Sequence, residues 1–163
     1  ADDVYRHPTV LEKVAQIMEV QGLDALFGDV EFFHPSAPDK VVRTYDSGRF
    51  KPSRIAWGWM PAHPALFVRR DIYERFGHFR EDYRIAGDYE FVARIFKNGQ
   101  IRSGHVARVL VRMQTGGLST AGLRATYVLN KEILRACREN GIASNWLMVL
   151  SKYFYKLREL LHA

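Results

Sequence analysis

The spacing of hydrophobic residues predicts an amphipathic helix near the start of the chain, over residues 8–20. Hydrophobic side chains recur there every three or four positions, as one buried face of an α-helix requires. They are Val10, Leu11, Val14, Ile17 and Met18. Pro8 suits the first turn, where its missing N–H removes no hydrogen bond, and Gln21-Gly22 ends the helix.

Short runs of hydrophobic and β-branched residues predict strands at 25–33, 41–45 and 65–69. The turn-forming residues 35–40 join the first two strands into a hairpin. Between the second and third strands lies a long stretch, 46–64, that contains two glycines and three prolines. We expect an irregular binding loop there, because its aromatic side chains are not typical of disorder.

The second half of the chain is predicted to be mainly helical. A short helix over 71–76 is followed by a longer one that begins at Asp88 and stops at Asn98-Gly99. A strand over 106–113 and a turn lead into helices from Thr120 onward, with a break near Gly141. Together these elements predict a mixed α and β fold.

Composition narrows the classes of protein. The 163 residues are enough for one domain or a piece of a larger one. A single cysteine, Cys137, excludes an intramolecular disulfide framework and favours a reducing, cytoplasmic location. No hydrophobic run approaches the ~20 residues of a membrane-spanning helix. The 24 basic and 18 acidic residues give a net charge of +6, which favours anionic partners.

Several motifs follow one another in a recognisable order. They are Asp2-Asp3-Val4-Tyr5, Met60 to Arg70, Tyr73 to Gly77, Asp82 to Phe91, and Val111 to Ser119. Together they resemble the family-2 glycosyltransferases, inverting enzymes of the GT-A fold that build bacterial surface polysaccharides. The resemblance covers about residues 1–125 and leaves 126–163 as a helical tail.

The resemblance implies that this chain is the C-terminal, acceptor-side half of such a transferase. In that family an N-terminal α/β half holds the nucleotide, and here the sequence begins at the acidic motif, so we expect that half to be missing. The implied substrates are a nucleotide-sugar donor and a growing surface glycan or lipid-linked acceptor.

The family's acidic motif implies a divalent cation, Mg²⁺ or Mn²⁺, bound by hard carboxylate oxygens. Asp3 is the implied direct ligand, with Asp2 contacting metal-bound water or the donor. An acidic segment exposed to solvent, or a set of caps for the first helix, is the structural alternative.

Asp88 occupies the position of the family's general base, which accepts a proton from the acceptor hydroxyl. Its place at a predicted helix start stabilises a negative charge. Gly87 replaces the glutamate that usually precedes this aspartate. An ordinary acidic residue at a helix start is the alternative.

Other candidates have a structural interpretation of equal weight. His63, between two prolines, is either a donor or acceptor contact or a structural histidine. Trp57 and Trp59 either stack on a sugar or pack the loop onto the core. A donor-phosphate site or a simple strand-to-helix turn, with Ser119 as N-cap, explains a further group: Arg112, Gly116, Gly117 and Ser119.

The helical tail combines hydrophobic residues at helical spacing with lysines and an arginine. Such a helix lies on a membrane surface or packs against protein. The competing function is therefore a non-catalytic, basic module that binds glycans or membrane. Nucleic-acid binding rests on net charge alone, since no known motif supports it, and we expect none.

Overall fold

The computed structural model describes residues 3–115 and 122–161, with the side chains of Asn98 and 155–161 excluded. The chain divides into two compact units. Unit 1 comprises residues 1–50, 61–77 and 99–117, and unit 2 comprises 51–60, 78–98 and 118–163. The two units therefore interleave along the sequence.

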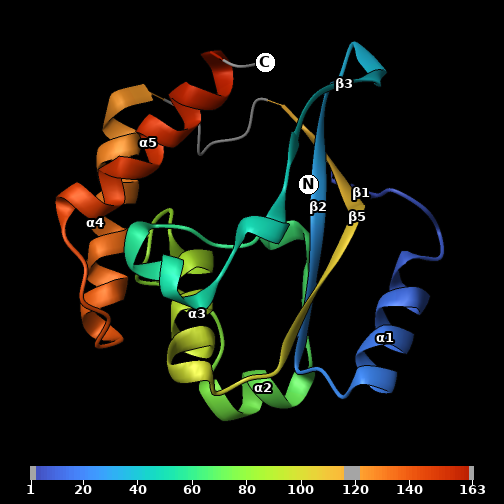
Figure 1. Ribbon diagram of the computed structural model, residues 1–163, viewed down its shortest axis with the longest axis horizontal. Coiled ribbons are helices and arrows are strands. Elements are labelled where there is room, and N and C mark those ends of the chain that lie inside the picture. The colour runs from blue at the N-terminus through green and yellow to red at the C-terminus, as the bar shows by residue number, and fades with distance from the viewer. Residues whose placement is uncertain (1–2, 116–121, 162–163) are drawn as a thin grey trace. The chain divides into compact units, whose positions relative to one another are not determined.

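Unit 1 is built on a mixed five-stranded sheet with β2 at its centre (Figure 1). Its strands are β1 (Val4–Tyr5), β2 (Ala25–His34), β3 (Ala37–Tyr45), β4 (Leu66–Val68) and β5 (Ser103–Gln114). One edge of β2 pairs in parallel with β5. The other edge pairs antiparallel, first with β4 and then with β3. Finally, β1 pairs antiparallel with β5.

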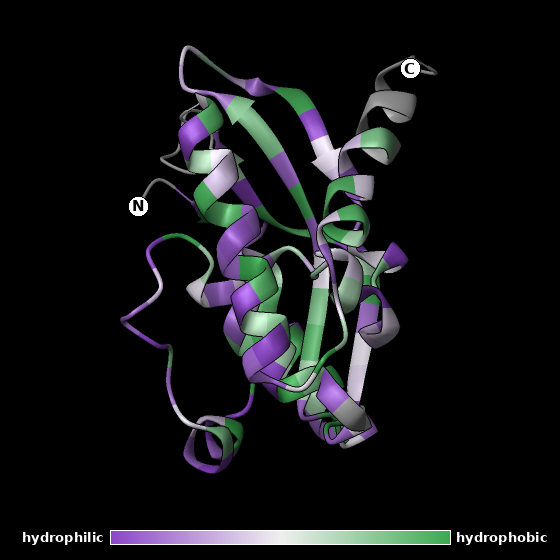
Figure 2. Ribbon diagram, turned by 90° about the vertical axis from the view of Figure 1, so that its left-hand side faces the viewer, coloured by the Kyte–Doolittle hydropathy of each residue, from purple (hydrophilic) through white to green (hydrophobic). Residues whose placement is uncertain are grey.

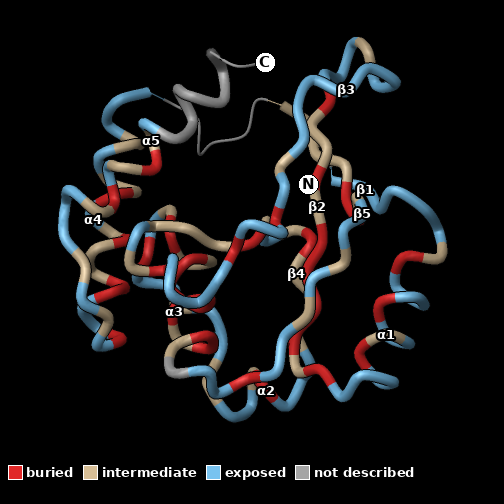
Figure 3. Tube along the Cα trace, viewed as in Figure 1, coloured by how far each residue is buried: buried red, intermediate tan, exposed pale blue. Residues whose placement is uncertain are grey.

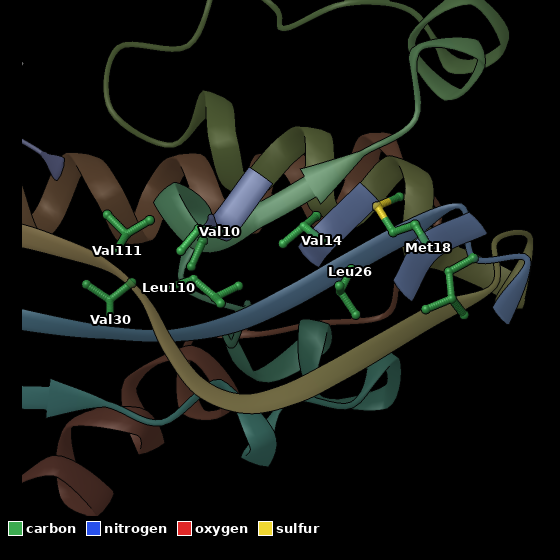
Figure 4. Close-up of a cluster of buried hydrophobic side chains, with 9 residues drawn as sticks. Val10, Val14, Met18, Leu26, Val30, Leu110 and Val111 are labelled. Atoms are coloured by element: carbon green, nitrogen blue, oxygen red, sulfur yellow. The ribbon is translucent and has the colours of Figure 1, made fainter. Parts of the chain in front are cut away.

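One face of this sheet is covered by α1 (Val10–Gln21). Its buried residues Val10, Val14 and Met18 pack on side chains of β2 and β5 (Figure 4), namely Leu26, Val30, Leu110 and Val111. Gly22 ends the helix in the left-handed conformation, with φ of 60°, which glycine adopts without a steric penalty. The predicted helix over 8–20 is thus confirmed, displaced by one or two residues.

Short helices fill the stretch that was expected to be irregular. They are the 3₁₀ helices η1 (Ser47–Arg49), η2 (Pro52–Trp57) and η3 (His63–Ala65). Two of them begin with proline in the first turn, where it restricts the backbone to helical angles. The expectation of an irregular loop over 46–64 is therefore wrong for most of its length, because proline there starts helical turns.

Unit 2 is helical in the part that the structure describes. It contains η2, α3 (Gly87–Phe96), α4 (Gly122–Glu139) and α5 (Trp146–Leu161). α3 packs against α4, and α5 packs against both α4 and η2. Large buried side chains of α3, including Tyr89, Phe91 and Phe96, are almost fully inaccessible. Figure 3 shows the buried residues of these helices as red segments between exposed ones.

Tyr89 links three segments of this helical unit. Its hydroxyl donates to the carbonyl of Ile55 in η2 and lies 3.3 Å from the sulfur of Cys137 in α4. Burial raises the pKa of Tyr89 above its ordinary range and also raises that of the Cys137 thiol. Both groups are therefore uncharged at neutral pH, and Cys137 is a packing residue.

The remaining elements confirm a mixed α and β fold, with differences at their ends. The hairpin of β2 and β3 is confirmed, but β3 begins at Ala37 instead of residue 41. Strand β5 begins at Ser103, before the expected 106. The short helix α2 (Arg70–Phe76) follows β4 as expected. Over the described residues, no helix combines the length and the hydrophobicity that crossing a bilayer requires.

Gly28 in β2 is a position where the sheet requires glycine. A Cβ atom there would lie 2.5 Å from Cγ of Leu110 and 2.9 Å from the carbonyl oxygen of Arg108. This oxygen belongs to the backbone of β5, which pairs with β2 on both sides of Gly28, so it cannot swing aside as the end of a flexible side chain could. We expect Gly28→Ala to lower the free energy of unfolding by about 1–3 kcal/mol through overpacking, measured by chemical denaturation. Gly87→Ala is the control, because its Cβ would meet only ordinary contacts at 3.5 and 3.7 Å; equal losses in both variants would contradict the steric argument.

Candidate functional site

Asp3 and His63, from two separate motifs, line one hollow of unit 1. The pairing of β1 with β5 brings the start of the chain here, with Val4 opposite Arg112. His63 is exposed at the first position of η3. The hollow is completed by Val4, Tyr5, Pro64 and Val111. The structure therefore brings together two predicted site residues that are far apart in the sequence; Asp2 lies outside the described residues.

The donor atoms of this hollow suit a divalent cation. The Asp3 carboxylate is exposed and offers hard oxygen ligands. The imidazole of His63 lines the same hollow, and imidazole is a ligand of transition-metal ions, whereas Mg²⁺ prefers oxygen alone. Asp3 and His63 are therefore candidate ligands for a divalent cation in this hollow.

Arg112, expected at a donor phosphate, is engaged by other groups of unit 1. Its Nε lies 3.7 Å from the Glu31 carboxylate, and its guanidinium lies 4.8 Å from the ring centroid of Phe33. It also donates to the carbonyl of Pro38. These contacts fix Arg112 between β5, β2 and β3. Gly116, Gly117 and Ser119, its expected partners at the phosphate, lie outside the described residues.

Asp88 lies in the first turn of α3, in unit 2, and its side chain is half-buried. One carboxylate oxygen accepts a hydrogen bond of 2.7 Å from the backbone N–H of Tyr89. This contact holds the carboxylate against the start of the helix. The expected helix start is confirmed to within one residue, since α3 begins at Gly87.

Glu132 of α4 holds the segment that leads into α3. Its two carboxylate oxygens accept hydrogen bonds from three consecutive backbone N–H groups, those of residues 84, 85 and 86, at 2.8, 2.9 and 2.8 Å. Partial burial opposes the charged form of Glu132, but the three donors and the nearby Arg135 outweigh it and lower its pKa. Two residues after this anchored segment comes Asp88.

An ion-pair network ties the earlier part of the same segment to α4. Asp82 accepts two hydrogen bonds from Arg80, at 2.9 and 2.6 Å, and one from Arg135. Glu139 accepts from Arg135 at 2.8 Å, from Arg80 at 2.7 Å and from Tyr83 at 2.8 Å. Hydrogen bonds from the two arginines hold the pKa of Asp82 well below its usual range, and those from Arg135 and Tyr83 lower that of Glu139.

One face of α4 supplies all of these contacts. Glu132, Arg135 and Glu139 are spaced by three and four residues, so they project from the same side of the helix. Sequence reasoning missed this role. Alternating charges at helical spacing are typical of a helix face exposed to solvent. In the structure, the buried neighbours Ile133 and Cys137 show that this side of α4 packs against the protein.

The two predicted sugar-stacking residues both lie in unit 2, near the end of η2. Trp57 is 43% exposed. Trp59 is partly buried, with the guanidinium of Arg54 5.6 Å from its ring centroid. Trp57 therefore offers the more accessible ring for a ligand.

A second group of metal-ligating side chains, not anticipated from the sequence, lies in unit 1. Asp29, Asp46 and His105 place one ligand atom each within 4.8 Å of the others. Each also serves the fold. Asp29 accepts from the N–H of Ser47 at 2.9 Å and lies 3.2 Å from Nε2 of His105. Asp46 caps η1 through the N–H of Gly48.

Comparison with known proteins adds no further assignment to these residues. No protein-family model matches the sequence, and no curated protein matches it. Asp3, His63 and Asp88 are therefore candidates because of their chemistry, their placement and the motifs that contain them.

Acid should destabilise unit 2 through the carboxylates that hold the segment before α3. The pKa values of Glu132 and Glu139 are lower in the folded chain than their ordinary value of about 4.3. The stabilisation that these two carboxylates contribute is therefore complete above that value and is lost as the pH falls through the folded pKa.

We expect Glu132→Gln to lower the free energy of unfolding at pH 7 by about 1–3 kcal/mol and to flatten the decline of this free energy below pH 4.5. Denaturation followed by circular dichroism across pH 3–7 measures both effects. Glu12→Gln, at an exposed position of α1, should leave the profile unchanged, and an unaltered profile for Glu132→Gln would contradict the assignment.

Proposed function

We propose that this chain is the acceptor-side part of an inverting glycosyltransferase that moves a sugar from a nucleotide-diphosphate donor to a glycan or lipid-linked acceptor. The observation that carries the proposal is that Asp3 and His63 line the same hollow. Each residue belongs to a different motif of the resemblance, and the two motifs are far apart in the sequence. The proposal takes the mixed sheet of unit 1 and the helices of unit 2 as part of a GT-A fold.

In this proposal Asp3 is a direct ligand of a divalent cation, Mn²⁺ or Mg²⁺, His63 of the same hollow is a second candidate ligand or a contact to donor or acceptor, and Asp2 is assigned to metal-bound water or the donor. When bound, such an ion neutralises the charge that develops on the departing diphosphate. Tyr5 forms a wall of the hollow and stacks on Phe67, with ring centroids 6.3 Å apart.

Asp88 is the proposed general base. It takes the proton of the acceptor hydroxyl while the acceptor oxygen bonds to the anomeric carbon and the bond from that carbon to the diphosphate oxygen breaks. Inversion follows from this single displacement. Glu132 is a positioning residue, because it fixes the backbone just before Asp88. Trp57 and Trp59 are proposed to stack on a sugar, and Arg112 with Gly116, Gly117 and Ser119 to contact the donor phosphates.

Binding of Mn²⁺ tests the metal assignment without any substrate. We expect Asp3→Asn to weaken Mn²⁺ binding at least about tenfold, as measured by electron paramagnetic resonance of the free ion. Asp46→Asn is the matched control, because it removes a carboxylate from the other candidate cluster of unit 1. If Asp46→Asn abolished binding while Asp3→Asn preserved it, the cation would belong to the other cluster and the assignment would be wrong.

Transfer activity tests the base. We expect Asp88→Asn in the full-length protein to lower the rate of sugar transfer by about 100-fold or more. This is the usual contribution of a general base. Donor and Mn²⁺ binding should persist, because the substitution keeps the size of the side chain. Glu81→Gln, in the same segment at an exposed position, is the control. Turnover near that of the unaltered protein would remove Asp88 from this role.

A further inference from the structure

Six large hydrophobic side chains are exposed on the two C-terminal helices of unit 2. Leu123, Leu147 and Phe154 are 91%, 83% and 74% exposed. Together with three less exposed residues they form what we call the α4–α5 patch: Leu123, Tyr127, Trp146, Leu147, Leu150 and Phe154. Figure 2 shows hydrophobic and hydrophilic residues alternating along the helices of the chain. On a water-soluble surface, single exposed hydrophobic side chains are ordinary, whereas a cluster of this kind marks an interaction site.

The patch is continuous across the two helices. The rings of Tyr127 in α4 and Trp146 in α5 are stacked, with centroids 6.0 Å apart and planes 13° from parallel. Trp146, Leu150 and Phe154 follow at intervals of four residues, so they lie along one side of α5. The sequence had indicated only the tail helix as an interaction surface, and the structure adds α4 to it.

The rest of α5 is occupied by packing within unit 2. Val149 is fully buried. Tyr153 exchanges hydrogen bonds with Asn130 of α4, at 3.0 and 3.3 Å. α5 therefore has an inner face that unit 2 already uses, and the α4–α5 patch is what remains outside.

The charges around the patch are positive. Arg124, Lys131 and Arg138 are exposed on α4. The two acids of α4 are held by internal partners, Glu132 by the N–H groups of residues 84–86 and Glu139 by Arg80 and Arg135. No acid occurs in residues 146–154 of α5. A partner for this surface must therefore accept hydrophobic side chains and carry negative charge.

We propose that the α4–α5 patch docks on the surface of an anionic phospholipid bilayer. Tryptophan and tyrosine favour the depth of the headgroups, where the ring is buried and its polar atom is hydrated. Leucine and phenylalanine beside them reach the acyl chains, and neighbouring lysine and arginine attract anionic headgroups. The helices lie along the bilayer surface. This inference does not depend on the proposed sugar transfer, because it uses other residues.

Vesicle binding of the whole chain tests the inference. We expect the chain to sediment with vesicles that contain phosphatidylglycerol and to bind pure phosphatidylcholine at least about tenfold less. On binding, the tryptophan emission should shift to shorter wavelength in a Trp57→Phe, Trp59→Phe variant, in which Trp146 is the remaining tryptophan. Leu147→Ser with Phe154→Ser should reduce partitioning by about tenfold or more, because each buried hydrocarbon group adds to binding. Both side chains are too exposed to support folding, and an unchanged circular dichroism spectrum checks this.

Two further variants keep the test decisive. Arg124→Glu with Lys131→Glu reverses two of the three exposed positive charges of α4 without changing the hydrophobic residues, and should greatly reduce the preference for phosphatidylglycerol. Leu11→Ser with Val20→Ser changes two side chains of α1 that are 51% and 79% exposed, and should leave binding unchanged. Equal sedimentation of the α4–α5 variant and the unaltered chain would overturn the proposal. So would a chain that ignores vesicles and instead forms dimers that the α4–α5 variant abolishes.

Discussion

The three hydrogen bonds to Glu132 are the constraint on which the helical unit depends. Residues 84–86 belong to neither a helix nor a strand, so their N–H groups have no partner within a regular element, and a buried N–H without a partner is costly. One carboxylate supplies all three partners, and the adjoining Arg80, Asp82, Arg135 and Glu139 fix the residues just before them. The start of α3 is therefore determined by α4, which comes much later in the sequence. Asp88 takes its position from this arrangement.

In unit 1, the residues of the candidate site are positioned by backbone pairing. Strand β1 is only two residues long, and it joins the sheet by pairing with β5. This short pairing carries Asp3 to the hollow where η3 presents His63. Backbone pairing thus positions the carboxylate in unit 1, whereas side-chain contacts position the one in unit 2.

Local patterns predicted the elements that local patterns specify. The spacing of Val10, Val14 and Met18 identified α1, and the turn residues after β2 identified the hairpin. The two-residue β1 is too short to show any period, and its partner lies at the other end of unit 1. The role of Glu132 also escaped, because its three partners are 46 to 48 positions away in the sequence. Asp3, His63 and Asp88 became candidates because of the motifs that contain them, and that the first two line one hollow follows only from the sheet register.

The parallel pairing of β2 with β5 has a consequence for synthesis of the chain. β2 ends at His34, whereas its partner begins only at Ser103. During translation, one edge of a largely buried strand therefore stays unpaired until most of unit 1 and all of α3 have left the ribosome. Unpaired strand edges recruit other chains, and pairings between distant segments form slowly. The newly made chain is thus exposed to aggregation for longer than a protein whose neighbouring strands are consecutive in sequence.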